Sequence, residues 1–363
     1  MNLTTHYQIA LSLLNGIGPS KAKQILESLD SLEELFLLSD RDLHIASGLP
    51  RRIINRMERK QALDIAEIVI ENSKRAQVRP IFYTDPEFPR RLRHCTDPPL
   101  VLYVKGQGDL NPERSVAIVG TRMSTEYGEL ICEELVQTLS EANVDIISGL
   151  AYGIDTFAHR ASVRNQNPTI AVLGNGLDRI YPYTNAQLSR EIMHQGALVS
   201  EFVVGTPPDR ENFPQRNRVV AGMSDAVIVV ESKESGGSLI TAKLAMDYTR
   251  DVFAFPGDIR SEASKGCNKL IQNDGAHLVN SGLDILKFMG WNRPILESIQ
   301  RKAFSSLNPV QQEILSMIEP MGTHIDHLSA RSNKPISLLN SELLFLELEG
   351  LIRPLPGNRY VAV

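Results

Sequence analysis

The 363-residue chain is long enough for two or three domains, and its 42% hydrophobic and 22% charged residues are typical of globular proteins. A net charge of -5 excludes a generally basic nucleic-acid-binding protein but not a local basic groove. Three separated cysteines (Cys95, Cys132, Cys267) have no metal-ligand spacing and predict reduced thiols in a cytoplasmic protein. With no signal-peptide pattern and no apolar run near the roughly 18 residues that span a bilayer, we expect no membrane contact.

Residues 1–75 predict an all-α module, because their apolar side chains recur at helical spacing. Within it, 15–25 resembles a helix-hairpin-helix motif: two glycines permit a tight turn, a proline suits the first helical position, and Ala22 and Ile25 are expected to face inward. A weaker copy follows at 46–52. Two interpretations stay open: the hairpin N–H groups hold a DNA phosphate, or the module is a helical packing unit of the SAM type. Its ten basic and ten acidic residues do not separate them.

The next part of the chain, 76–293, predicts one α/β domain. Short strand patterns at 81–84 and 101–104 are expected to extend its sheet. Apolar runs then alternate with helical patterns of ten or more residues, which is typical of a parallel sheet covered on both faces. The predicted strands are 116–120, 144–148, 169–174, 197–202, 226–231, 252–256 and 276–279.

After a predicted linker at 294–307, residues 308–363 have the winged-helix pattern of three helices and a two-stranded hairpin. The helices are predicted at 309–318, 325–332 and 337–349. The third helix of a winged helix often enters duplex DNA. Here it carries three glutamates and no Lys or Arg, and the whole segment has four basic and six acidic residues. This charge favours a protein-contact or regulatory role, while duplex binding stays open.

Two predicted strands run into a glycine-containing turn and then into a helix, at 120–122 and at 148–153. Backbone N–H groups at such strand ends point into the crevice at the carboxyl edge of a parallel sheet, where they bind anions. In the first turn, Thr121 and Ser124 are expected to cap the following helix. The turn lacks the GxGxxG fingerprint, because positions 120, 122 and 125 read Gly, Arg and Thr. This argues against a dinucleotide cofactor.

The second turn starts with Ser148 and Gly149, and glycine lets the backbone approach a phosphate closely. Asp155 follows, where it is expected to cap or orient the turn. His159 lies on the next helix among apolar residues, which is typical of a packed histidine rather than a catalytic one.

A third cluster places three arginines, an asparagine and an aromatic within nine residues: Arg210, Phe213, Arg216, Asn217 and Arg218. Guanidinium groups on phosphates and bases stacked on an aromatic ring are the means by which proteins hold single strands. An alternative stays open, in which Phe213 anchors the loop in the core and the arginines pair with acidic neighbours such as Glu201.

In the fourth cluster, Gly236 and Gly237 turn the chain and Ser238 opens a helix, which predicts another anion site. Lys265 and Asn268 lie in a segment that is expected to precede a helix ending at Gly275. Several anion sites around one crevice suit a polyanion or a nucleotide. The chain has no P-loop, no GxSxG motif and no metal-ligand spacing, so we predict no catalytic residue, metal or cofactor.

Six motifs in this order resemble the DNA-processing protein A (DprA/Smf) family. They are GTR at 120–122, SGLAYGID at 148–155, FPQRNRVVAG at 213–222, ESGGSLITA at 234–242, PGD at 256–258 and KGCNKLIQNDGA at 265–276. The resemblance implies an α/β fold with an extended Rossmann-like, parallel-rich sheet. It also implies a SAM- or helix-hairpin-helix-like module before the sheet and a winged helix after it.

The resemblance further implies what the protein does and with whom. A member of this family binds single-stranded DNA, protects incoming strands and loads RecA recombinase on them during natural transformation. It eases the displacement of single-strand-binding protein and dimerises through the Rossmann-like domain. No catalytic activity follows from the resemblance.

The family's DNA-binding residues carry over to matching positions of this chain. Arg122 would hold a phosphate, Phe213 would stack on a base, and Arg210 stands where many members have lysine. Arginine keeps the charge there but changes the geometry. The full set implied is Gly120, Thr121, Arg122, Ser148, Gly149, Arg210, Phe213, Arg216, Asn217, Arg218, Gly236, Gly237, Ser238, Lys265 and Asn268.

Two alternatives to a non-enzymatic DNA-binding protein stay open. Rossmann-like enzymes of the lysine-decarboxylase-like (LOG) group release bases from nucleoside monophosphates through a PGGxGTxxE motif. Residues 235–242 are the nearest match, and they lack the glutamate. The second alternative is an interaction scaffold that acts through the winged helix.

Overall fold

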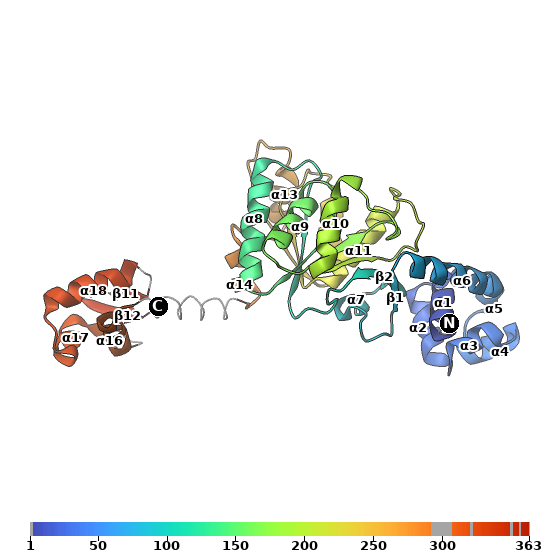
Figure 1. Cartoon of the computed structure of the whole chain (residues 1–363), viewed down its shortest axis with the longest axis horizontal. Helices are drawn as coiled ribbons and strands as arrows, with labels where there is room; N and C mark the ends of the chain where they lie inside the picture. The colour runs from blue at the N-terminus through green and yellow to red at the C-terminus, as the bar shows by residue number, and fades with distance from the viewer. Residues whose placement is uncertain (1–2, 292–306, 320–321, 349–350, 356, 363) are drawn as a thin grey trace. The chain divides into compact units, whose positions relative to one another are not determined.

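The computed structural model describes residues 3–291, 307–319, 322–348, 351–355 and 357–362 (Figure 1). Its contacts divide the chain into two compact units, Met1–Leu286 and Lys287–Val363. The predicted linker lies almost wholly outside the described residues, and the predicted domain boundaries stay predictions. No helix in the described ranges is both long enough and apolar enough to cross a membrane.

The first unit begins with a helical module, as the apolar spacing predicts. Its helices are α1 (Leu3–Leu13), α2 (Pro19–Ser28), α3 (Leu32–Leu37), α4 (Asp40–Ser47), α5 (Arg51–Ile54) and α6 (Arg59–Arg75). Pro19 occupies the first turn of α2, and Ala22 and Ile25 are fully buried, which confirms the inward face. The turns before α2 and after α4 use positive φ angles at Gly16 and Gly48, a conformation that glycine adopts without strain.

In the described part of the same unit, nine strands form one sheet in the order β1-β2-β6-β5-β4-β3-β7-β8-β9. The strands are β1 (Arg79–Phe82), β2 (Val101–Gly106), β3 (Ser115–Val119), β4 (Asp145–Ser148), β5 (Thr169–Leu173), β6 (Ala197–Ser200), β7 (Ala226–Val229), β8 (Asp251–Ala254) and β9 (His277–Leu278). Their ends differ from the predicted ones by no more than two residues. β3 to β9 pair in parallel, whereas β2 is antiparallel to β6, and β1 to β2. The α/β fold with an extended, parallel-rich sheet is therefore confirmed.

Helices connect the strands and cover both faces of the sheet. The helices that contact one another form two groups, one for each face. One group is α8 (Glu126–Glu141), α9 (Ile154–Arg164) and α10 (Ala186–Gln195); the other is α7 (Arg90–Arg93), α11 (Asn212–Met223) and α12 (Gly237–Asp247). The helices α13 (Lys265–Gln272) and α14 (Gly282–Phe288) follow. The strand order reverses at β3, whose neighbours are β4 and β7. Ligands of open α/β sheets bind in the crevice at such a switch point.

The second unit is a winged helix, as predicted. It contains α16 (Pro309–Met317), β10 (Thr323–His324), α17 (Ile325–Ser332), α18 (Ile336–Leu348), β11 (Ile352–Leu355) and β12 (Arg359–Ala362). Ile314, Leu328, Leu339, Leu343 and Leu346 form its fully buried centre. The sequence did not indicate β10, because two residues carry no alternation; this strand pairs with β12 and completes a three-stranded sheet.

Candidate nucleic-acid interface

A groove of about 680 Å³ lies in the crevice at the switch point of the sheet. It is bounded by the turn after β3, the start of α11 and the turn before α12. The structure thus brings together residues that are up to about 120 positions apart in the chain. The predicted residues that line the groove are Gly120, Thr121, Arg122, Arg210, Phe213, Arg216, Asn217, Gly236, Gly237 and Ser238.

Arg122 and Phe213 form a contact pair within this groove. The Arg122 guanidinium carbon lies 5.1 Å from the centre of the Phe213 ring, a cation–π geometry. The Tyr181 ring lies on another side of Phe213, with 5.8 Å between ring centres. Phe213 is half-buried, and Arg122 is exposed without an ion-pair partner among the described residues. Phe213 therefore packs against Tyr181 and Arg122 while part of its ring faces the groove. Base stacking on this ring stays a prediction.

Arg216 lies beneath the groove, with only 5% of its surface exposed. Its guanidinium donates hydrogen bonds to the backbone carbonyls of Gly149 and Val172. Burial raises the pKa of the neighbouring Asp155 carboxyl, and the Arg216 charge partly offsets this increase. A Cβ atom at Gly149 would lie 2.3 Å from the guanidinium. Glycine at 149 thus serves the close approach of this buried cation.

The two turns expected to bind external anions are already occupied by carboxylates of the chain itself. At the start of α8, the Glu231 carboxylate accepts hydrogen bonds from the Thr125 backbone N–H at 2.9 Å and the Thr125 hydroxyl at 2.6 Å. In the second turn, Asp155 accepts from the N–H groups of Gly149 at 3.1 Å and Ala151 at 3.4 Å. These carboxylates take the positions at which dinucleotide-binding folds hold a pyrophosphate.

The capping residue of α8 is Thr125, so the expectation for Thr121 and Ser124 is wrong. Thr125 has extended backbone angles and its hydroxyl accepts from the Gly128 N–H at 3.4 Å. The Thr121 hydroxyl instead accepts from the Met123 N–H at 3.2 Å within the turn. Asp155 does orient the second turn, as expected from the sequence.

The start of α12 lines the groove without a side-chain cap. Its N-cap residue, Gly236, has no side chain to cap the helix, and a Cβ at Gly237 would have no neighbour within 4 Å. Ser238 turns its hydroxyl inward to Ser232, at 2.8 Å. Exposed Lys233 adds a positive charge beside the backbone N–H groups at the start of α12. A phosphate in the groove would therefore find N–H donors and a cation together.

Five predicted residues are absent from the groove lining: Gly149, described above with Arg216, and four others. Arg218 pairs with the Glu201 carboxylate and donates to the Asp97 carbonyl, as the alternative interpretation of the cluster foresaw. The Ser148 hydroxyl donates to the Ile118 carbonyl at 2.6 Å. Lys265 pairs with Glu262, and Asn268 bridges the backbone of Gly257. We therefore leave these four residues out of the proposed DNA contacts.

Sequence reasoning missed Tyr181, Lys233 and Glu231. Tyr181 and Lys233 line the groove from segments that follow β5 and β7. An aromatic or cationic residue shortly after a predicted strand indicates a residue of the crevice, because the carboxyl ends of parallel strands lie at one edge of the sheet. Glu231 gave no comparable signal, since its partner Thr125 is 106 residues away.

His159 is fully buried, as expected for a packed histidine, and one ring nitrogen lies 2.8 Å from the Thr169 hydroxyl. Burial, and then the Arg216 charge, lower the pKa of His159 from 6.5 to about 3. The unfolded chain binds a proton here below pH 6.5 and the folded chain does not, so stability falls as the pH falls from 6.5 towards 3. Between pH 6.5 and about pH 5 we expect a loss of about 2 kcal/mol.

Urea unfolding of wild type and His159→Gln at both pH values measures this loss. The difference in stability between wild type and His159→Gln should change by this amount between the two pH values, whereas the difference between wild type and the exposed control His194→Gln should not change. Burial raises the pKa of Asp145 to about 7, so this carboxyl increases the stability of the folded chain as the pH falls. Wild type and variant share this contribution, and the comparison between them therefore isolates His159. Equal pH dependence in wild type and His159→Gln would contradict the assignment.

Family models and curated relatives match most of the length of the chain. The family model described as DNA recombination-mediator protein A matches residues 79–290, and the model of the DprA winged helix domain matches residues 301–358. The Smf protein of Synechocystis is 33% identical, and the alignment covers 98% of each chain.

Two solved structures are similar as well. The DNA processing protein A of Streptococcus pneumoniae aligns with a TM-score of 0.67 and 37% identity, over 79% of this chain and 98% of that one. The DNA processing protein A of Helicobacter pylori, described for its single-stranded DNA binding mode, aligns with a TM-score of 0.54 and 28% identity, over 59% and 95%. On the family match and the full-length relative, the chain belongs to the DprA/Smf family of DNA-processing, recombination-mediator proteins.

Proposed function

We propose that the groove binds single-stranded DNA and that the protein loads RecA recombinase on the bound strand. The observation that carries this proposal is the set of groups in one groove: the Arg122–Phe213 pair, exposed Arg210 and the uncapped start of α12. A cationic track with an aromatic ring is the general means of holding single strands without reading their sequence. The related H. pylori protein, with its single-stranded DNA binding mode, supports the same function here.

The groove is better suited to binding than to hydrolysis. Asp155 is the one carboxylate among its described lining residues, and backbone N–H groups and Arg216 already engage it. A base-releasing hydrolase needs a carboxylate free to act on the substrate. The groove residues therefore do not favour the LOG-type alternative. Release of free base from AMP by the purified protein would revive it.

A gel-shift comparison of single-stranded and duplex DNA, with and without RecA, tests the proposal directly. We expect the single strand to bind in preference to the duplex, with an affinity that falls as salt rises. On strands coated with single-strand-binding protein, the protein should accelerate the appearance of RecA's DNA-dependent ATPase activity. Equal affinity for both DNA forms, or no effect on RecA, would contradict the corresponding half of the proposal.

We also propose that the protein forms a homodimer through its Rossmann-like domain. β9 is the last strand of the sheet, and no further strand pairs with its outer edge in the described residues. Leu278 of β9 is 50% exposed. Open edges with apolar side chains favour pairing with another chain. Light scattering during gel filtration measures the oligomeric state, and a monomer at all concentrations would exclude the dimer.

The winged helix is proposed to act by protein contact rather than by holding the strand. Every residue of the groove belongs to the first compact unit. Deleting 301–363 should therefore leave the affinity for oligo-dT unchanged within about twofold, because the deletion removes no residue that lines the groove. Fluorescence anisotropy measures this affinity. A clear loss of affinity would assign the winged helix a direct DNA contact, whereas abolished RecA loading at unchanged affinity would support protein contact.

A further inference from the structure

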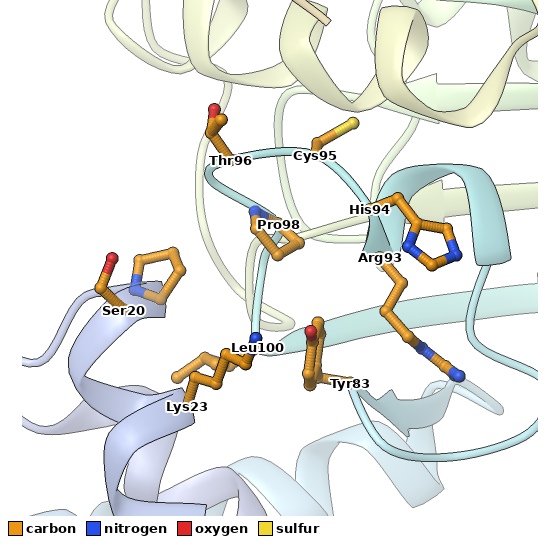
Figure 2. Close-up of a pocket in the computed structure, with 10 residues that line it drawn as sticks. Ser20, Lys23, Tyr83, Arg93, His94, Cys95, Thr96, Pro98 and Leu100 are labelled. Atoms are coloured by element: carbon orange, nitrogen blue, oxygen red, sulfur yellow. The ribbon is translucent and has the colours of Figure 1, made fainter.

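A second cleft lies within the first unit, between the helical module and the sheet. It has a volume of about 430 Å³. Ser20 and Lys23 line it from α2, and Tyr83, Arg93 and His94 line it from the segments around β1 and α7 (Figure 2). Leu100 and two prolines supply its apolar surface. None of these residues takes part in the groove described above.

The charged side chains of this cleft are all basic or histidine. No Asp or Glu is among its lining residues in the part of the chain that the structure describes. Lys23 pairs with Glu27 at 3.8 Å, with both side chains about two-thirds exposed, so the pairing is weak. Arg93 donates to the Asp85 backbone carbonyl and has no carboxylate partner within the described ranges. Apart from this exposed Glu27 partner, the described lining of the cleft carries positive charge and no carboxylate.

Arg93 is also held in one place. Its guanidinium carbon lies 5.9 Å from the ring centre of Tyr83 and 5.7 Å from that of Phe88. Its Nε atom is buried and has no hydrogen-bond partner among the described residues. A cation fixed over aromatic rings loses little further freedom when an anion binds to it.

The uncharged polar groups of the cleft are equally unengaged. The side chains of Ser20, Tyr83, His94 and Thr96 line it, and none makes a hydrogen bond within the described structure. The Tyr83 side chain adds a half-buried aromatic face beside Arg93. Hydroxyl donors, cations and an aromatic face together are the groups that recognise a phosphorylated nucleotide.

The register of the sheet places the cleft at the same edge as the groove. β2 runs antiparallel to β6, with Tyr103 opposite Ser200, so Leu100 lies beyond the carboxyl end of β6. Tyr83 follows β1 and lies at this edge too, because β1 is antiparallel to β2. Two strand spacings, about 10 Å, separate β2 from β5. Gly174, which follows β5, lies next to the Phe213 ring.

The wall of the cleft is bonded to the helix that carries the groove residues. Asp97 lies between the wall residues Thr96 and Pro98. Its backbone carbonyl accepts from Arg218 of α11, and its carboxylate accepts from the Tyr248 hydroxyl after α12. Arg218, outside the groove, thus fixes the cleft wall relative to α11.

From this geometry we propose that the cleft binds one phosphorylated nucleotide, with the phosphate at Lys23, Arg93 and His94 and the base at Tyr83. The ligand is a nucleotide of the strand that leaves the groove along the carboxyl edge, or a free nucleotide of the same chemistry. The proposal that the ligand is a nucleotide of the bound strand rests on the proposed function of the groove. The proposal that the ligand is a free nucleotide does not depend on that function.

The test compares Lys23→Ala/His94→Ala with the matched control Lys74→Ala/His194→Ala in the full-length protein. All four side chains are exposed or half-buried at the surface, and the control pair lines neither the groove nor the cleft. Anisotropy is measured with labelled oligo-dT of about 6 and about 20 nucleotides, lengths that bracket the reach of one binding surface. We expect the cleft variant to bind the long strand about fivefold more weakly and the short strand as wild type does. Its salt slope for the long strand should fall by about 0.7 for each phosphate that the variant no longer neutralises.

A calorimetric titration with dTMP distinguishes the two ligands, a nucleotide of the bound strand and a free nucleotide. Binding of dTMP by wild type but not by the cleft variant, with unchanged affinity for both oligonucleotides, assigns the cleft to free nucleotides. A length-dependent weakening without dTMP binding assigns it to the strand, and 5-iododeoxyuridine in the long strand should then cross-link to Tyr83. If the cleft variant matches the control on both oligonucleotides and wild type does not bind dTMP, the proposal is overturned. Failure of the groove is recognised separately, because Arg122→Ala would then leave short-strand affinity unchanged.

Discussion

Replacing Phe213 with alanine lowers the affinity for an oligo-dT strand by about tenfold or more, because one stacked base contributes about 1–3 kcal/mol. The ring lies at the groove between Arg122 and Tyr181, and only part of its surface is covered by the protein. A base can therefore contact it without a rearrangement of the fold. Anisotropy titration of labelled oligo-dT at fixed salt measures the change.

Tyr183→Ala is the matched control for this loss. Tyr183 is a neighbouring aromatic residue that is 84% exposed and lies outside the groove lining. Its replacement should leave the affinity unchanged. If Phe213→Ala and Tyr183→Ala bind as wild type does, no base stacks on Phe213 and the groove is assigned wrongly.

The same titration extends to Arg122→Ala and to the double variant. Removing the Arg122 charge should weaken binding and reduce the salt slope by about 0.7, the value of one phosphate contact on a single strand. The two single effects should not add, because Arg122 and Phe213 touch each other and residues in contact couple. A fully additive double variant would indicate that the pair does not act as one unit on the strand.

The second large effect is expected from Gly149→Ala, which should lower the free energy of unfolding by about 2–4 kcal/mol. The added Cβ would meet three guanidinium atoms of Arg216 at 2.3 to 2.5 Å. Arg216 can move away only by giving up its bonds to the Gly149 and Val172 carbonyls and its approach to Asp155. A buried charge pair that loses its geometry no longer offsets its cost of desolvation.

Gly237→Ala provides the control, since its Cβ would have no neighbour within 4 Å. This variant should unfold at the same urea concentration as wild type or slightly above it, because alanine favours the helix more than glycine does. The Gly149→Ala protein should also bind oligo-dT more weakly, since Arg216 lies under the groove. Unchanged stability of Gly149→Ala would show that Arg216 is free to reposition.

Under the proposed function, the occupied turns account for a groove that binds a strand and holds no dinucleotide. Glu231 and Asp155 neutralise the N–H groups at the first two helix starts, so an external phosphate gains little there. The uncapped start of α12 and the arginines lie to the side of these positions in the same groove. In the proposed complex, the phosphates therefore bind at the rim of the groove, where a continuous DNA backbone can pass, rather than at the pyrophosphate position.

The sequence by itself determined the parallel sheet, the helical module, the winged helix and the family. Apolar strand runs and helical periodicities are local patterns, and the six motifs are contiguous segments, so neither depends on knowing distant contacts. It also identified half of the residues that line the groove, because residues that follow parallel strands meet at one edge of the sheet.

Only the tertiary structure decided which of these groups remain available to a ligand. Arg216 and Arg218 look equivalent in the RNR run, yet two residues rotate a helix by about 200°, so one lies under the groove and the other pairs with Glu201. Glu231 fills the first turn from 106 residues away. Whether a cation or an N–H group is free depends on such non-local partners, and a local pattern contains no information about them.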